Sequence, residues 1–206
     1  MRIGFFGGSF DPPHLGHLSV AIAAAEAFGL NRVFLAPTGR QPLKPEGAVA
    51  PFEDRFAMVA LLCDEESYAH QAHLEASKLD APHEDGSPNF TVEALARLKA
   101  ASGPEDTLFL IVGVDAFLGV RRWKSSNALF EFAEWIVVSR PGFSSAELAS
   151  LNLGPAQMSR VHLLEHVNEE ASATNIRSLI ATGSDCDGLL PASILRYIRT
   201  RHLYGT

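Results

Sequence analysis

The sequence is poor in cysteine and in positive charge. Its two cysteines, Cys63 and Cys186, stand far apart and without a C-x-x-C spacing. This pattern argues against a zinc site and against a disulfide framework. Lysine and arginine total 17 against 24 aspartates and glutamates, which leaves a formal net charge of −7. Binding to nucleic acid or to an anionic membrane needs a basic surface, so neither partner is expected.

Long apolar runs are also missing. No stretch approaches the length needed to span a bilayer, and the first predicted strand starts so early that a signal peptide has no room. A cytoplasmic protein is therefore expected. The chain has 206 residues, of which 47% are hydrophobic and 20% charged. These values predict one globular domain over residues 1–206.

The first twenty residues carry the densest pattern. Residues 3–6 predict a short buried strand, after which Gly7 and Gly8 predict a sharp turn with exposed backbone N–H groups. His14 and His17 follow three residues apart, which places both imidazoles on one face of a starting helix. Free N–H groups and a helix N-terminus favour an anion, most obviously phosphate. Two imidazoles beside it can donate hydrogen bonds to charge that develops during phosphoryl chemistry.

Further along, predicted helices alternate with predicted strands. Apolar periodicity predicts helices over residues 15–28, 52–63, 91–101, 171–183 and 192–201, and strands over residues 32–37, 68–79, 107–112, 135–138 and 160–167. The opening strand–helix–strand order implies a parallel pair. The sequence therefore predicts an α/β, Rossmann-like fold, a parallel sheet flanked by helices with a small helical C-terminal part. Ligands of such sheets bind beyond the carboxyl ends of the strands.

Several polar or aromatic residues follow predicted strands. Gly113 and Asp115 come directly after the strand over 107–112, and Asp115 either accepts from a ribose hydroxyl or caps the next helix. Trp123 stands in a polar segment, which predicts an exposed indole that can stack on a flat ring. Trp135 lies in an apolar strand and is predicted to belong to the core.

Four cationic residues are candidate phosphate ligands. Arg140 ends a predicted strand and offers bidentate donors. The Gly- and Pro-rich loop that follows the second strand holds Arg40 and Lys44, one of which could reach a phosphate. Ser172 or Thr174 can cap a helix and leave its N–H groups free, with Arg177 on the same face. The alternative for each is an ordinary surface charge or an ordinary helix cap.

One motif indicates a different chemistry. His162-Leu-Leu-Glu165-His166 has the H-x-x-E-H form of a class of zinc peptidases. That chemistry needs a helix that presents both histidines on one face, together with a third ligand. The flanking residues predict a strand instead, so no metal site is predicted here.

The same residues carry a family resemblance. Gly7-Gly8-Ser9-Phe10-Asp11-Pro12-Pro13-His14-Leu15-Gly16-His17 resembles the G-[ST]-F-D-P-x-H-x-G-H signature of the H-x-G-H nucleotidyltransferases. These enzymes transfer a nucleotidyl group from ATP or CTP to a phosphate or phosphorylated acceptor. The segment over residues 171–177 is similar to their second signature, I-S-S-T-x-x-R. Asn89-Phe90-Thr91, Gly113-x-Asp115, Trp123 and the S-R-P-G turn at 139–142 narrow the resemblance to bacterial nicotinate mononucleotide adenylyltransferases.

The resemblance implies a set of roles and partners. His14, His17 and Arg177 would be catalytic. ATP would be bound by these three and by Gly7, Gly8, Ser9, Phe10, Gly113, Asp115, Ser172 and Thr174. Nicotinate mononucleotide would be bound by Lys44, Phe90, Thr91, Trp123 and Arg140. Mg²⁺ would be held mainly by ATP oxygens and water, with no metal-ligating residue in the chain.

Three departures and several alternatives accompany this interpretation. Ala171 and Ala173 stand where the second signature has isoleucine and serine. Gln41-Pro42-Leu43-Lys44 stands where the family usually has P-P-H-[KR], which leaves Lys44 alone there. Phe90 replaces the commoner tyrosine. The same transfer to nicotinamide mononucleotide or pantetheine phosphate stays open, as does a nucleotide sensor without catalysis. The sequence gives no indication of oligomeric state.

Overall fold

The computed structural model describes residues 1–42, 46–66, 72–139, 145–165, 167 and 171–206. At its centre is a six-stranded sheet in the order β3-β2-β1-β4-β5-β6, and all five strand pairs are parallel. The strands are β1 (Arg2–Gly8), β2 (Arg32–Pro37), β3 (His73–Ala76), β4 (Thr107–Gly113), β5 (Glu134–Val138) and β6 (Val161–Leu164). The predicted Rossmann-like parallel sheet is confirmed.

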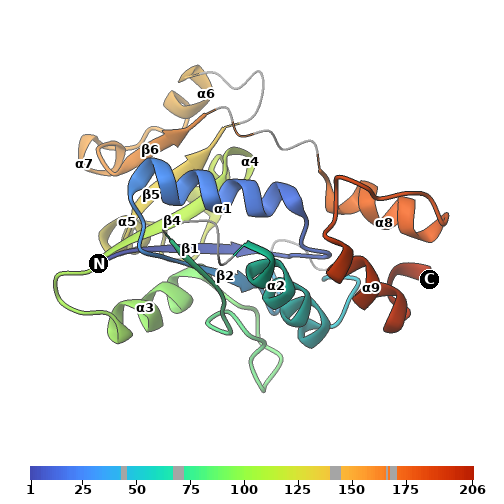
Figure 1. The fold of residues 1–206 in the computed structure, drawn as a ribbon. Helices are drawn as coiled ribbons and strands as arrows, with labels where there is room; N and C mark the ends of the chain where they lie inside the picture. The colour runs from blue at the N-terminus through green and yellow to red at the C-terminus, as the bar shows by residue number, and fades with distance from the viewer. Residues whose placement is uncertain (43–45, 67–71, 140–144, 166, 168–170) are drawn as a thin grey trace.

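Helices cover both faces of the sheet (Figure 1). They are α1 (Leu15–Phe28), α2 (Phe52–Glu66), α3 (Thr91–Ala101), α4 (Val114–Phe117), α5 (Ser126–Phe132), α6 (Ser145–Ala149), α7 (Pro155–Met158), α8 (Ala173–Ala181) and α9 (Ala192–Thr200). Two 3-10 turns, η1 (Val120–Arg122) and η2 (Leu203–Gly205), complete the described elements. None of the described helices is both long and apolar enough to cross a membrane.

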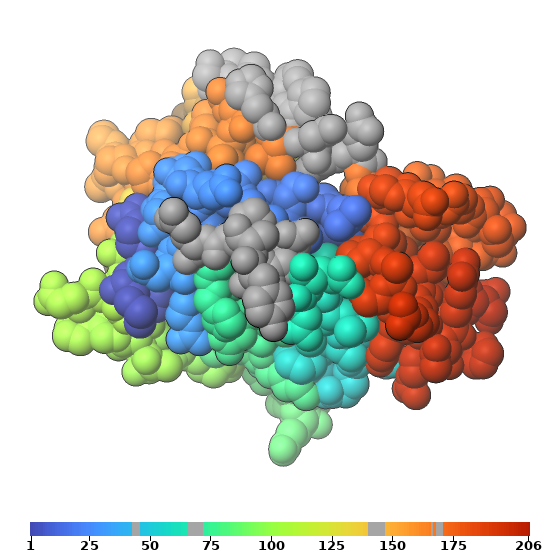
Figure 2. All heavy atoms as spheres, in the orientation of Figure 1, coloured from blue at the N-terminus to red at the C-terminus, as the bar shows by residue number. Residues whose placement is uncertain are grey.

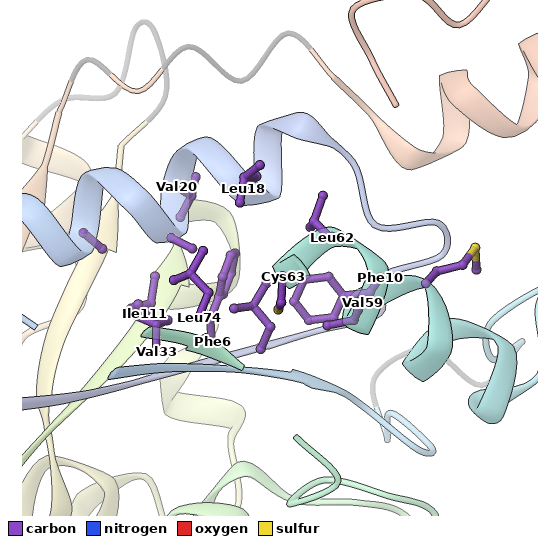
Figure 3. Packing of buried hydrophobic residues seen from close by; sticks show 14 of the residues in the cluster. Phe6, Phe10, Leu18, Val20, Val33, Val59, Leu62, Cys63, Leu74 and Ile111 are labelled. Atoms are coloured by element: carbon purple, nitrogen blue, oxygen red, sulfur yellow. The ribbon is translucent and has the colours of Figure 1, made fainter. Parts of the chain in front are cut away.

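The alternation of side chains along the strands divides the core in two. In β1, Phe6 packs into the cluster that contains residues of α1, α2, α8 and α9, whereas Ile3 and Phe5 pack into the cluster formed with α3, α4 and α5. Figure 3 shows the first cluster, with Phe6 and Ile111 of the sheet beneath Leu18 and Val20 of α1. Each helical layer is therefore held by one face of the same strands.

The C-terminal helices lie at the end of the sheet toward which β1 runs. In Figures 1 and 2, α8 and α9 occupy one end of the molecule, next to the start of α1. Ile176 of α8 and Ile194 and Ile198 of α9 are fully buried in the first core cluster. The predicted helical C-terminal part thus packs on the sheet domain, at the edge where parallel sheets bind ligands.

Three predictions about local structure were wrong in detail. Gly7 and Gly8 do not turn the chain: they are the last residues of β1, paired with Ala36 and Pro37. The turn comes later, where Phe10 adopts a positive φ of 48°. The two edge strands are shorter than predicted, because β3 pairs only with Arg32–Leu35 and β6 only with Trp135–Val138. Of the longer strand predicted over 68–79, residues 68–71 lie outside the described part.

Candidate active site

The paired histidines stand where the chain enters α1. His14 is the N-cap residue and His17 lies in the first turn, so their ring centroids are only 3.7 Å apart. The backbone N–H of His14 donates to Nδ1 of His17 at 3.2 Å. Since this nitrogen accepts, the proton of a neutral His17 resides on Nε2, which leaves that atom as the donor. The predicted placement of both rings on one face is confirmed.

Both imidazoles are neutral at pH 7 in the free protein. Burial lowers the pKa of His14 to about 4, and its Nδ1 has no hydrogen-bond partner among the described residues. Burial and, second, the charge of His14 lower the pKa of His17 well below its ordinary value. The His17 ring packs 4.8 Å from the Phe10 ring and 6.0 Å from the Phe6 ring. Neutral, desolvated imidazoles act as oriented hydrogen-bond donors.

The histidines open into a cavity of about 470 Å³, here called the histidine cavity. It is lined by the loop after β1 (Ser9, Phe10, Asp11), by His14 and His17, by residues 38–41 and 46–49 in part, by Arg55, and by Ser172, Ala173, Thr174 and Arg177 at the start of α8. Ser172 is the N-cap of α8 and makes no side-chain cap bond. The start of α8, where the structure shows no side-chain capping bond among the described residues, therefore lines one space together with two imidazoles and two arginines.

A second cavity, of about 460 Å³, lies beyond the ends of β1 and β4; we call it the tryptophan cavity. Its lining includes Gly7, Gly8, Asp80, Asn89, Phe90, Thr91, Gly113, Asp115, Arg122, Trp123 and Lys124. Ser9, Thr38 and Gln41 line both cavities. The two spaces thus meet at these three residues.

The structure brings most of the predicted site residues together, in two groups. Ser9, Phe10, His14, His17, Ser172, Thr174 and Arg177 line the histidine cavity, and Phe90, Thr91 and Trp123 line the tryptophan cavity. Gly7, Gly8, Gly113 and Asp115, predicted to bind ATP, line the cavity that holds Trp123. Lys44 and Arg140 lie outside the described residues.

Two local expectations need correction. Trp123 is half-buried rather than exposed, because its ring packs 6.0 Å from that of Trp135; Trp135 itself is fully buried, as predicted. Asp115 does not cap α4, because the N-cap is Gly113 and Asp115 lies inside the first turn. Trp123 thus packs against the core and still lines the cavity.

Arg177 is tied to the loop after β1. Its Nη1 donates to the backbone carbonyl of Asp11 at 2.6 Å, and its Nη2 donates to the Thr174 hydroxyl at 3.2 Å. The contact with Thr174 confirms that the two side chains share a face of α8. Arg177 therefore joins the C-terminal part to the N-terminal motif, with its guanidinium on the histidine cavity.

Arg55 is a site residue that the sequence analysis missed. It is only 2% exposed, and its guanidinium donates to the carbonyls of Ser9, Thr38 and Ala50 at 2.6, 2.9 and 3.1 Å. Burial lowers the pKa of Arg55, and the negative charge of Asp11 offsets this in part. No local pattern marks this residue, because its three partners are distant in sequence or belong to irregular backbone.

Asp11 accepts several hydrogen bonds at the wall of the histidine cavity. Its carboxylate accepts from the N–H groups of Val49 and Ala50 at 2.6 and 3.0 Å, and from the hydroxyl of Tyr204 at 2.7 Å. Asp11 is 4% exposed, so these donors replace the water it has lost. Asp11, which also accepts from Tyr204, therefore fixes the backbone of Val49 and Ala50, and Val49 lines the histidine cavity.

The described part of the H-x-x-E-H motif lies in a strand or directly after it. His162 lies in β6, as predicted, and its Nε2 is 3.0 Å from a carboxylate oxygen of Glu134. His166 lies outside the described residues. Within the part of the chain that the structure describes, no group of three or more His, Cys, Asp or Glu residues could hold a metal ion.

Comparison with known proteins agrees with this geometry. A sequence model described as "Cytidylyltransferase-like" matches residues 5–179, a range that contains both signatures. The chain belongs to the cytidylyltransferase-like family. Among its relatives in this family, a protein from Desulfatibacillum aliphaticivorans named "Probable nicotinate-nucleotide adenylyltransferase" is 35% identical, over 99% of this chain and 100% of that protein. A protein of the same name from Solibacter usitatus is 33% identical over 100% of both chains.

Solved structures of other proteins share the fold of this chain. The Plasmodium falciparum nicotinic acid mononucleotide adenylyltransferase, solved in complex with NaAD, superposes with a TM-score of 0.76 at 15% identity and covers 98% of this chain and 97% of its own. A nicotinate-nucleotide adenylyltransferase structure from Vibrio parahaemolyticus, titled as putative, gives a TM-score of 0.65 at 18% identity, with coverages of 99% and 95%. At these identities the likeness establishes the fold.

Proposed function

We infer that this protein is a nicotinate-nucleotide adenylyltransferase. It transfers the adenylyl group of ATP to nicotinate mononucleotide and releases nicotinate adenine dinucleotide and pyrophosphate, a step of NAD biosynthesis. One observation carries this inference: a cavity with two neutral histidines and an arginine meets a cavity with a tryptophan and Thr91. Full-length relatives at 33–35% identity carry the corresponding name.

The histidine cavity suits the triphosphate. The start of α8 and the Arg177 guanidinium can donate to phosphate oxygens. The buried Arg55 adds positive charge beside them, although its own N–H groups donate to backbone carbonyls. We propose that Arg177 holds the β- and γ-phosphates, while His14 and His17 donate to the α-phosphate as charge develops on it. Their lowered pKa values mean that they donate as neutral imidazoles in the free enzyme. ATP would be the ligand on this side of the junction.

The tryptophan cavity suits a flat aromatic nucleotide. The indole of Trp123 would stack on the nicotinate ring, with Thr91 near its carboxylate and Phe90 beside it. Lys44 and Arg140 stay predicted acceptor ligands, because they lie outside the described residues. With the ring held by Trp123, the acceptor phosphate would reach the junction at Ser9, Thr38 and Gln41.

The transfer requires the two substrates to be positioned correctly and does not require a covalent adenylyl-enzyme intermediate. An acceptor phosphate at the junction attacks the α-phosphorus, and pyrophosphate leaves on the opposite side. The bond from the acceptor oxygen forms as the bond to the pyrophosphate oxygen breaks, so no residue needs to carry the adenylyl group. His14 and His17 would stabilise the charge on the transferring phosphate throughout this exchange.

Mg²⁺ would enter with ATP. Both carboxylate oxygens of Asp11, which lines the histidine cavity, are already occupied by N–H groups and by Tyr204. The described residues therefore fit a cation that keeps water and phosphate oxygens as its ligands, as Mg²⁺ usually does. When bound, the ion neutralises charge on the phosphates. The cytoplasmic location expected from the sequence stays a prediction.

Pyrophosphate release tests the proposal. Purified protein receives ATP and Mg²⁺ with nicotinate mononucleotide, nicotinamide mononucleotide or pantetheine phosphate in parallel, and His17→Ala serves as the inactive control. We expect release with the nicotinate nucleotide, at least tenfold faster than with either other acceptor, and its loss in His17→Ala. Equal rates with the nicotinamide nucleotide would remove the acceptor assignment. Nucleotide binding without release in any mixture would instead indicate a sensor.

A further inference from the structure

The buried guanidinium of Arg55 lies where β1 and β2 separate. Pairing between these two strands ends at Gly8 and Pro37. The carbonyls of the next residues, Ser9 and Thr38, both accept from Arg55, at 2.6 Å from Nη1 and 2.9 Å from Nη2. Ser9 and Thr38 also line both cavities. One side chain therefore joins two of the residues that form the junction.

Arg55 also closes a ring of hydrogen bonds around the turn that follows β1. Its Nε donates to the carbonyl of Ala50 at 3.1 Å, and the N–H of Ala50 donates to Oδ1 of Asp11 at 3.0 Å. Because Nη1 holds the carbonyl of Ser9, the ring runs from Ser9 through Arg55 and Ala50 to Asp11. Phe10 is the residue between the two ends of this ring.

The backbone of Phe10 needs such a constraint. Its φ of 48° lies in the left-handed region, which a bulky residue rarely adopts. Residues in such conformations persist where the surrounding structure fixes them. The ring of hydrogen bonds fixes the chain on both sides of Phe10, at Ser9 and at Asp11. The conformation of Phe10 therefore depends on Arg55.

The side chain of Phe10 in turn supports an active-site imidazole. Phe10 is 1% exposed, and the centroid of its ring lies 4.8 Å from that of His17. Both Phe10 and Phe6, whose rings meet edge-on at 5.5 Å, belong to the first core cluster (Figure 3). The His17 imidazole thus packs on a ring that the turn places, while its Nδ1 accepts from the N–H of His14. A shift of the turn would remove this support and reorient the Nε2 donor.

From these contacts we propose that Arg55 is a positioning residue for adenylyl transfer. It holds the turn at Phe10 and, through the Phe10 ring, keeps the His17 imidazole in the orientation that donates to the α-phosphate. The donation to the α-phosphate rests on the proposed function. The orientation of His17 is a property of the free protein and can be measured without any substrate.

The planar shape of the guanidinium supplies the matched variant. Arg55 directs three N–H groups to three carbonyls in one plane, whereas a lysine keeps the charge and offers a single compact ammonium. Arg55→Lys therefore loosens the ring without removing the charge. Leu98→Ala is the control, because Leu98 is buried in the second core cluster and lines neither cavity. It should lower Tm by a similar amount through lost packing.

The first measurement is nitrogen NMR of the imidazoles in the free proteins, with His17→Ala used to assign the resonances. In the wild type, the His17 signals should show one tautomer with its proton on Nε2. In Arg55→Lys they should move toward the average of the two tautomers, because the ring is no longer held. In Leu98→Ala they should stay at the wild-type positions.

The second measurement is steady-state kinetics with ATP, Mg²⁺ and nicotinate mononucleotide. Active sites are counted by calorimetric titration with a non-transferable ATP analogue, so that unfolded protein does not enter kcat. In Arg55→Lys we expect kcat to fall about 10- to 100-fold, as a misplaced catalytic group predicts, while both KM values stay within about threefold. Leu98→Ala should keep kcat within about twofold of the wild type. If Arg55→Lys does not fold, Arg55→Gln, whose amide still donates, replaces it with the same expectations.

Three results overturn the proposal: unchanged His17 signals in the Arg55 variant, equal changes in Leu98→Ala, or a raised KM for ATP with an unchanged kcat. The last result would make Arg55 a direct ligand of ATP. The two claims fail separately. Displaced His17 signals in a protein whose wild type transfers no adenylyl group would remove the proposed function and keep the positioning of His17. Transfer by the wild type with undisplaced His17 signals in the variant would do the reverse.

Discussion

Tyr204 offers the sharpest test of how the C-terminal part shapes the histidine cavity. Its hydroxyl donates to Oδ1 of Asp11 at 2.7 Å, across 193 residues of sequence. Burial, and next the charge of Asp11, raise the pKa of Tyr204, so the hydroxyl keeps its proton and stays a donor. Replacing Tyr204 with Phe keeps the ring and removes only this donor.

The magnitude follows from the charge of the acceptor. A hydrogen bond to a charged group contributes about 1.5–3 kcal/mol, and Asp11 retains its two backbone donors, so the lower end applies. A loss of about 1.5 kcal/mol corresponds to a decrease in Tm of about 3–6 °C for a chain of this size. Asp11 also orients the N–H groups of Val49 and Ala50. We therefore expect the KM for ATP to rise about three- to tenfold with a smaller change in kcat.

Tyr197→Phe is the control for this variant. The Tyr197 hydroxyl donates to Asp54 at 2.9 Å, also from the C-terminal part to a buried carboxylate. Neither residue lines the histidine cavity. Thermal unfolding and steady-state kinetics should show a similar decrease in Tm and an unchanged KM for ATP. Equal increases of KM in both variants, or an unchanged KM in Tyr204→Phe, would refute the reasoning.

Three further predictions concern single side chains. Arg55→Lys keeps the charge but offers one compact donor to three carbonyls, so urea unfolding should show a loss of about 2–4 kcal/mol; unchanged stability would contradict this. Burial lowers the pKa of His14 from 6.5 to about 4, so the unfolded chain binds this proton first as the pH falls. The stability that neutral His14 contributes, about 3 kcal/mol, is therefore complete above pH 6.5 and is lost as the pH falls toward 4. His14→Asn should show a shallower acid-side loss of unfolding free energy, and equal slopes would refute the prediction. Trp123→Ala should raise the KM for nicotinate mononucleotide about tenfold through lost stacking and leave the KM for ATP unchanged; a change confined to ATP would contradict the assignment of the two cavities.

The fold was predictable because its signals are local. The apolar run over 107–112 indicated a buried parallel strand and forms β4, and the spacing of His14 and His17 indicated one shared face. The lengths of β3 and β6 were not predictable, because each is limited by the one strand it pairs with. Gly7 and Gly8 look like a turn in sequence and end a strand in the structure, since pairing with β2 decides their conformation.

The parts of the site that sequence reasoning missed depend on distant contacts. Arg55 reads as one charge on a helix, and only the folded chain brings three carbonyls around its guanidinium. Asp80 stands in an irregular segment without periodicity, so neither its burial nor its cavity could be predicted. The roles proposed for His14, His17 and Arg177 come from the signatures, and the structure brings all three side chains to one cavity.

The central claim is direct transfer of an adenylyl group across the junction of the two cavities. The most direct test uses ATP made chiral by sulfur at the α-phosphorus, with nicotinate mononucleotide as acceptor and analysis of the configuration in the dinucleotide product. A single in-line displacement predicts inversion at phosphorus. Retention would mean that a residue, with His14 and His17 the nearest candidates, first carries the adenylyl group, and the account of two facing substrates would then be wrong.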